Sequence, residues 1–180
     1  MPDVALSPPI SPADGAPENV RRALAPIRND FSVAIYNCQN AFAVGAIIRV
    51  AHNFLAREII VIGEEPYYAK ASMGMEKYES IAVVRDADAF FDHLAGRPLW
   101  ALEKDHARRS IYAVGAFPRD VVLLFGSERA GLPVALVERA DDVLGIPIYG
   151  INHSLPVAVA AGIAMSEWAR RRYQEGATVP

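Results

Sequence analysis

Arg49 is the first residue whose type and position suggest chemistry. It lies in the segment 40–51, which also contains Gly45 and is followed directly by His52. If this segment is helical, a rotation of 100° per residue places Arg49 off the apolar stripe, on a side shared with Gly45 and His52. A guanidinium beside a surface opened by glycine can bind a phosphate. The solvated face of an amphipathic helix explains the same pattern, so the segment alone leaves both interpretations open.

A second segment, 124–133, joins an apolar run to a loop with two glycines and a carboxylate. Gly126, Glu128 and Gly131 occupy this loop, and Pro133 can start the following helix. Ligands of open parallel sheets bind beyond the carboxyl ends of strands, which makes the loop a candidate binding site. An ordinary turn, in which the glycines supply backbone freedom, is the alternative.

The third segment, 146–165, carries Ser154 at a position suited to capping a helix. Pro156 falls within the first turn of that expected helix, where proline is tolerated. Ala158 and Gly162 leave one flank of the helix without bulky side chains, which allows close packing against a sheet, another helix or a second subunit. Core packing by itself accounts for these small residues.

Several classes of function lack their signatures. The sequence has no GxGxxG, GxxxxGK[ST], GxSxG or HExxH motif. Its four histidines have no histidine four residues away, and Cys38 is the single cysteine, so we expect no metal site and no internal disulfide. A net charge of −3 and a pI near 5.8 show no overall basic footprint, which on charge alone favours a small-molecule enzyme.

Nothing in the sequence indicates a membrane segment or export. No stretch approaches 18 uninterrupted apolar residues, and the N-terminus lacks a basic region followed by an apolar run. We therefore expect a soluble, cytoplasmic protein with no membrane partner.

The elements that must position these residues alternate between strands and helices. Apolar runs predict strands and amphipathic patterns predict helices, which together indicate one α/β domain with a mainly parallel sheet and helices on both faces. A weakly structured N-terminal segment with a short helix (1–26) precedes this domain (27–173), and a tail (174–180) follows it. The expected strands are 31–36, 58–63, 80–85, 99–102, 121–126 and 143–148, and the main helices are 41–55, 86–95, 133–139 and 154–172.

Taken in order, the three segments resemble the motifs of the SpoU-type RNA 2′-O-ribose methyltransferases of the SPOUT superfamily. VGAIIRVA resembles motif one, LLFGSERAGLP motif two, and IPIYGINHSLPVAVAAGIA motif three, and the similarity covers roughly residues 31–172. The resemblance implies an α/β fold with a C-terminal deep trefoil knot that binds S-adenosylmethionine. It also implies a homodimer with active sites assembled at the subunit interface.

The resemblance also implies roles for particular residues. Arg49 matches the arginine held to orient the RNA and help deprotonate the ribose 2′-hydroxyl, while Glu128 and Ser154 match the motif-two carboxylate and the motif-three serine. These three are the expected catalytic residues. The expected cofactor-binding residues, acting largely through backbone groups, are Leu102, Glu103, Gly126, Ile146 and Leu155.

RNA is the expected partner, with transfer RNA slightly preferred over ribosomal RNA. Because few residues precede the folded region, we expect the catalytic dimer itself to hold the RNA, in contacts that are local and weakened by salt. A solvated surface position is the alternative for each basic residue. The expected RNA contacts are Arg49, Arg108 and Arg109, with Arg21, Arg22, Arg28 and Arg170 to Arg172 as further candidates.

Two departures from the family motifs support a competing hypothesis. Ala43 stands where motif one usually has an asparagine, and Pro156 stands in place of the asparagine of motif three. Both changes remove polar groups, and proline also lacks a backbone N–H. Asn40 and Asn152 are candidate substitutes. The alternative function is an RNA-binding or regulatory relative with weak or no transferase activity.

Overall fold

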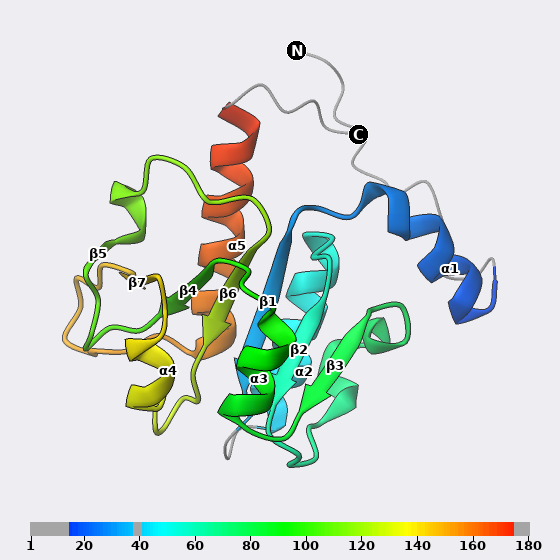
Figure 1. Cartoon of the computed structure of the whole chain (residues 1–180), viewed down its shortest axis with the longest axis horizontal. Helices are drawn as coiled ribbons and strands as arrows, with labels where there is room; N and C mark the ends of the chain where they lie inside the picture. The colour runs from blue at the N-terminus through cyan, green and yellow to red at the C-terminus, as the bar shows by residue number, and fades with distance from the viewer. Residues whose placement is uncertain (1–14, 38–40, 175–180) are drawn as a thin grey trace.

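The computed structural model describes residues 15–37 and 41–174 of the 180-residue chain. Within them, seven strands form one sheet, all parallel, in the order β3-β2-β1-β6-β4-β7-β5 (Figure 1). The expected α/β class and parallel sheet are confirmed. The strands are β1 (Phe31–Tyr36), β2 (Ile59–Ile62), β3 (Ile81–Val84), β4 (Leu99–Leu102), β5 (Arg109–Ser110), β6 (Val121–Phe125) and β7 (Asp142–Gly145).

Helices cover both faces of the sheet. Two of them, α2 (Ala41–Asn53) and α5 (Val157–Gln174), lie behind it in Figure 1, and α3 (Ala87–Leu94) and α4 (Val134–Glu138) lie in front. The sheet therefore separates two apolar cores, which explains why its central strands are apolar on both sides. The remaining helices are α1 (Pro17–Leu24) and the short 3₁₀ turns η2 (Ala25–Ile27), η3 (Ala69–Ser72), η4 (Met75–Lys77) and η5 (Ile111–Ala113).

Side chains that alternate along the strands supply the two cores. Val33 of β1 and Leu123 of β6 face α2 and α5, whereas Ala34 and Leu124 face α3 and α4. All four are fully buried, and β1 pairs in register with β6, with Val33 opposite Leu123. This packing holds the carboxyl ends of the central strands at one edge of the sheet, where a ligand site is expected.

Several features differ from the sequence prediction. β5 was not expected, because a strand of two polar residues at the sheet edge has no apolar run to reveal it. The segment 64–80 holds η3 and η4, which carry no helical periodicity in the sequence.

The start of the long C-terminal helix also differs. α5 begins at Val157, three residues after the predicted start, so Ser154 is an exposed loop residue and does not cap the helix. The carbonyl of Pro156 is the first to accept helical hydrogen bonds, from the N–H groups of Val159 and Ala160. A proline entering the helix fixes its own φ but cannot donate a hydrogen bond, which sets this boundary.

Candidate functional site

A pocket of about 270 Å³ lies at the carboxyl ends of β4, β6 and β7, next to the start of α5. This volume is just below the roughly 300–1,000 Å³ typical of small-molecule sites. The pocket brings together Glu128, Ser154 and the five residues expected to bind a cofactor. Those five lining residues are Leu102, Glu103, Gly126, Ile146 and Leu155.

The loop after β6 forms a tight turn that only glycine permits at two positions. Ser127 and Gly131 exchange two backbone hydrogen bonds, each 3.0 Å long, and Gly131 has a positive φ of 63°. A Cβ on Gly126 would lie 2.5 Å from the carbonyl carbon of Gly131, closer than real contacts allow. Both glycines are therefore required by the loop geometry, which is a stronger reason than general flexibility.

The carboxylate of Glu103 joins the end of β4 to this loop. Its Oε2 accepts a hydrogen bond of 3.1 Å from the backbone N–H of Leu132, and its Oε1 accepts one of 3.4 Å from Asp105. A Cβ on Gly131 would lie 2.7 Å from Oε2, so glycine there makes room for the carboxylate. Glu103 thus fixes two walls of the pocket relative to each other.

Glu128 joins the same loop to the first turn of α5. Its Oε1 accepts a hydrogen bond of 3.3 Å from the N–H of Val157, the first residue of the helix. A negative charge is favourable at a helix N-terminus, where backbone N–H groups lack partners. Ser154 lies nearby, exposed, with its N–H donating to Oδ1 of Asn152 at 3.4 Å. The side chain of Asn152 is therefore engaged within its own loop.

Arg49 does not line this pocket. Its side chain is exposed on α2, and none of the described residues forms a hydrogen bond or ion pair with it. The expectation that Gly45 opens the surface beside it is wrong. Gly45 is buried, and a Cβ there would lie 2.5 Å from the carbonyl oxygen of Tyr68, because the segment leading into η3 packs directly on α2.

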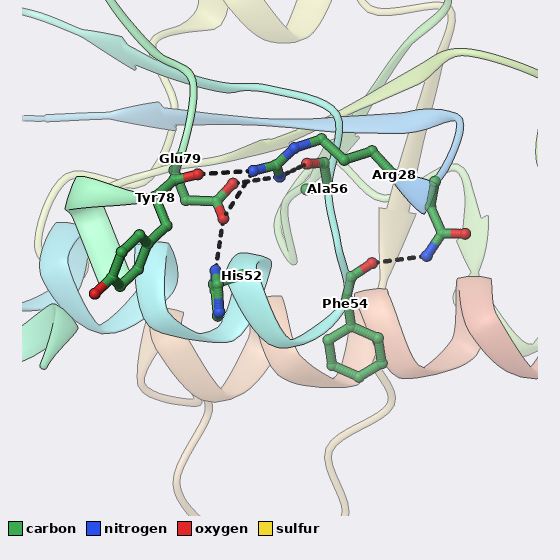
Figure 2. A network of polar contacts seen from close by, with 7 residues as sticks. Arg28, His52, Phe54, Ala56, Tyr78 and Glu79 are labelled. Carbon is green, nitrogen blue, oxygen red and sulfur yellow. Dashed lines mark hydrogen bonds and ion pairs between the residues drawn. The ribbon is translucent and has the colours of Figure 1, made fainter. Parts of the chain in front are cut away.

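A buried carboxylate next to the last turn of α2 organises a network that the sequence did not reveal. Figure 2 shows Arg28 and His52 approaching Glu79 from two sides. Arg28 donates to Oε2 and Oε1 at 2.6 and 3.2 Å, and Nδ1 of His52 lies 2.6 Å from Oε1. Arg28 also donates to the carbonyls of Ala56 and Tyr78. Because its side chain is only 10% exposed, Arg28 belongs to the protein interior and is not an RNA contact.

Most of the other candidate arginines also have partners within the chain. Arg108 donates to the carbonyls of Ala140 and Asp141. Arg109 binds the Asp142 carboxylate and lies over the Trp100 ring, 5.5 Å from its centroid. Similar pairs join Arg21 to Glu18, Arg170 and Arg171 to Glu167, and Arg172 to Asp30.

The two motif departures differ in their surroundings. Ala43 is 4% exposed and lies on the inner side of α2, whereas Pro156 is exposed at the entrance to α5. Asn40 and Cys38 lie outside the described residues.

Sequence reasoning missed the charged rim of the pocket, formed by Lys104, Asp105, His106 and Arg129. The run Lys104-Asp105-His106, which follows the predicted strand 99–102 after one residue, is the signal that could have revealed it.

Within the described residues, no group of His, Cys, Asp or Glu side chains is arranged to hold a metal ion. Among those same residues, no helix combines the length and the apolar character that a membrane crossing requires.

Comparisons with known proteins agree with the motif assignment. The chain is 30% identical over 138 residues to the 23S rRNA (guanosine-2'-O-)-methyltransferase RlmB of Coxiella burnetii, covering 72% of this chain and 54% of that protein. It is 27% identical over 152 residues to a tRNA (guanosine(18)-2'-O)-methyltransferase of Thermus thermophilus, covering 82% and 78%. The chain spans only 54% and 61% of the first two curated relatives it matches.

Solved structures share the fold. An AdoMet-bound rRNA methyltransferase from Sinorhizobium meliloti aligns with a TM-score of 0.71 and 31% identity, covering 83% of this chain and 59% of that one. The methyltransferase AviRb from Streptomyces viridochromogenes, in complex with AdoMet, aligns with a TM-score of 0.72 and 28% identity, covering 83% and 64%. The sequence model of the SpoU rRNA Methylase family matches residues 30–166, which include all three motif segments. The chain therefore belongs to the SpoU rRNA Methylase family.

Proposed function

We propose that the protein is an S-adenosylmethionine-dependent methyltransferase that modifies a ribose 2′-hydroxyl in RNA. The observation that carries this proposal is the pocket itself, which gathers Gly126 and Glu128 of the second motif segment, Ser154 of the third, and Glu103 at the end of β4. The family match and the relatives named as RNA (guanosine-2'-O-)-methyltransferases support the reaction class. None of these comparisons favours the alternative of a binding protein without transferase activity.

The residues of the pocket fit an amphipathic cofactor of this kind. Leu102, Ile146 and Leu155 give it apolar walls, and the strand ends and the loop at Gly126 bring backbone polar groups to the same cavity. S-adenosylmethionine, when bound, supplies a methyl group attached to a sulfonium. Glu103 and Glu128 hold the loop and the start of α5 in place, so that the walls are formed before the ligand arrives.

Arg49 is the residue proposed to act on the RNA. Its guanidinium is exposed and has no ion-pair partner among the described residues, so it can bind a phosphate and orient the ribose. Methyl transfer requires the hydroxyl oxygen to be aligned with the methyl carbon and its proton to be removed. In this proposal Arg49 and the phosphate it binds provide that alignment, the positive charge of the guanidinium favours the alkoxide, and the proton passes to solvent water.

We further propose that the active enzyme is a homodimer. Arg49 lies outside the pocket of its own chain, so the two parts of the site do not meet in one copy. A second copy that brings its Arg49 to the first chain's pocket would complete the site.

The same proposal includes the C-terminal trefoil knot, a cytoplasmic location and a slight preference for transfer RNA, the substrate named for the Thermus thermophilus relative.

The test of the reaction uses labelled S-adenosylmethionine with total tRNA and, separately, rRNA. We expect 2′-O-methyl nucleosides by mass spectrometry, and we expect R49A to lower the rate roughly 100-fold or more while cofactor affinity by calorimetry is unchanged. A wild-type protein that binds RNA but neither binds the cofactor nor yields this product would refute the proposal and favour the binding protein.

The test of the dimer mixes two variants that each impair one part of the site, assayed at a cofactor concentration at which neither alone shows appreciable activity. R49A keeps an intact pocket and G126A keeps Arg49, so a mixed dimer contains one complete site if the parts come from different subunits. We expect activity to return on mixing after subunit exchange. If light scattering shows a monomer, or the exchanged mixture stays inactive, the shared site is wrong.

A further inference from the structure

Two aromatic rings are exposed together at the start of α2. The side chains of Phe42 and Tyr68 are 65% and 49% exposed, their ring centroids are 6.2 Å apart, and their planes are inclined by only 20°. Exposing this much aromatic surface to water is unfavourable, and the exposed rings contribute nothing to the apolar core. Such an apolar surface typically marks a place where something binds.

The backbone holds Tyr68 in this position. Its N–H donates to the carbonyl of Ala41 at 2.9 Å, and its own carbonyl accepts from Ala71 at 3.0 Å and packs on Gly45. The neighbouring Tyr67 faces the other way: it packs against the core, and burial together with the nearby Glu76 carboxylate raises its pKa. The exposed pair is therefore preorganised, and binding would not have to order it.

The pair lies on the same side of α2 as Arg49. Phe42 and Arg49 are seven residues apart, which is about two turns and roughly 10.5 Å along the helix. Asn53 continues this exposed stripe, and the small Ala46 lies between the aromatic and basic side chains. One face of α2 thus presents, in a row, an aromatic ring, the small Ala46 and a guanidinium that no described residue pairs with.

The charges near the pair favour a phosphate-bearing ligand. Arg49 lies on the stripe, and Lys70 is exposed two residues after Tyr68. Glu64 and Glu65 are exposed earlier in the same connection, and Glu76 is engaged with the hydroxyl of Ser72. The basic groups therefore flank the aromatic rings, as in single-stranded nucleic-acid sites that combine stacking with cationic contacts.

We propose that Phe42 and Tyr68 form a stacking platform for an unpaired RNA base, whose neighbouring phosphate binds Arg49. This inference rests on the proposed function, because it assigns a position to the RNA substrate. The base stacks on the outer, exposed face of the Phe42 ring. Since every base has a π-face, the platform selects unpaired RNA over duplex and does not read base identity.

The test measures binding of a short single-stranded RNA containing 2-aminopurine, with a duplex of the same sequence for comparison. We expect 2-aminopurine quenching with wild type, and roughly 5- to 150-fold weaker binding for F42A. F42W should retain binding and quenching. V83A is the matched control, because Val83 is an equally exposed apolar residue (58%) on the edge strand β3 and should bind as wild type.

Salt dependence separates stacking from charge. F42A should weaken binding at every salt concentration with an unchanged slope of log affinity against log salt, whereas R49A should reduce that slope by about 0.7 to 1. Calorimetric binding of S-adenosylmethionine by F42A should equal that of wild type, which shows that the fold and the pocket are intact.

Three results would overturn the platform. The first is that F42A and Y68A both retain wild-type affinity and quenching; methylation of RNA by the wild type would then leave the proposed function standing. Conversion of F42A to a monomer by light scattering would make this patch an interface between copies. If the wild type neither binds nor methylates RNA, the proposed function fails and the platform fails with it.

Discussion

Removal of the Arg28 guanidinium is the sharpest test of how the fold is stabilised. Arg28 donates four hydrogen bonds, two of them to Glu79, whose side chain is completely buried (Figure 2). R28M retains most of the aliphatic volume but leaves that carboxylate without its strongest partner. Removing one member of a buried ion pair typically costs about 3–5 kcal/mol, because an uncompensated charge stays behind.

We expect R28M to lower the free energy of unfolding by about 3 kcal/mol, the lower limit of this range, because Nδ1 of His52 still contacts the carboxylate. For a chain of this size, each kcal/mol corresponds to roughly 2–4 °C, so the midpoint of thermal unfolding should fall by roughly 6–12 °C. Urea unfolding followed by circular dichroism measures the free energy directly.

Two further variants establish the cause of the loss. R57M removes the exposed pair between Arg57 and Asp120 and should cost less than about 1 kcal/mol. The double variant R28M/E79Q removes the buried charge together with its partner, so it should be more stable than R28M by about 1 kcal/mol or more. The reasoning is wrong, and Glu79 is screened by solvent, if R28M lowers the free energy of unfolding no more than R57M does. The same holds if adding E79Q to R28M does not restore stability.

Two other variants probe the site and the C-terminal helix. G126A should lower the affinity for S-adenosylmethionine at least about tenfold in calorimetry, because a Cβ there meets the backbone of Gly131; near-wild-type affinity would show that the loop adapts. Hydrogen bonding, chiefly from Arg170 and also from Arg171, holds the pKa of Glu167 below its ordinary value. Its stabilising effect is therefore complete above the unfolded pKa, about 4.3, and lost as pH falls through the lower folded pKa. E167Q should thus be less stable than wild type in urea at neutral pH but equal to it in strong acid, and a gap that persists in acid would contradict this assignment.

Local patterns in the sequence predicted the repeating parts of the fold. The strands 31–36 and 99–102 are confirmed at both ends, since short runs that are apolar almost throughout signal strands covered on both faces. α2 was expected over 41–55 and ends at Asn53. Element ends shifted where a specific residue decided the boundary, as Pro156 does for α5.

The candidate site was predicted in part. Three motif segments indicated strand ends and loops, and the structure places Leu102, Gly126 and Leu155 in one pocket. The sequence could not show that Gly45 packs against the segment leading into η3, because the contact joins residues with no common periodicity. Nor did it distinguish Arg28, which is buried in an ion pair, from Arg49, which is exposed.

The sequence by itself determined the family, the α/β class and which residues carry the motifs, because periodicity and motif spacing are properties of neighbouring residues. Only the tertiary structure decided which polar groups are used inside the protein. Glu103 binds the N–H of Leu132, 29 residues away, and Arg28 binds Glu79, 51 residues away. Such pairs form when strand order and packing bring distant segments together, and burial makes an unpaired charge too costly to leave. Among the described residues, the fold therefore uses some charged side chains in internal contacts and leaves others, such as Arg49, exposed without an ion-pair partner.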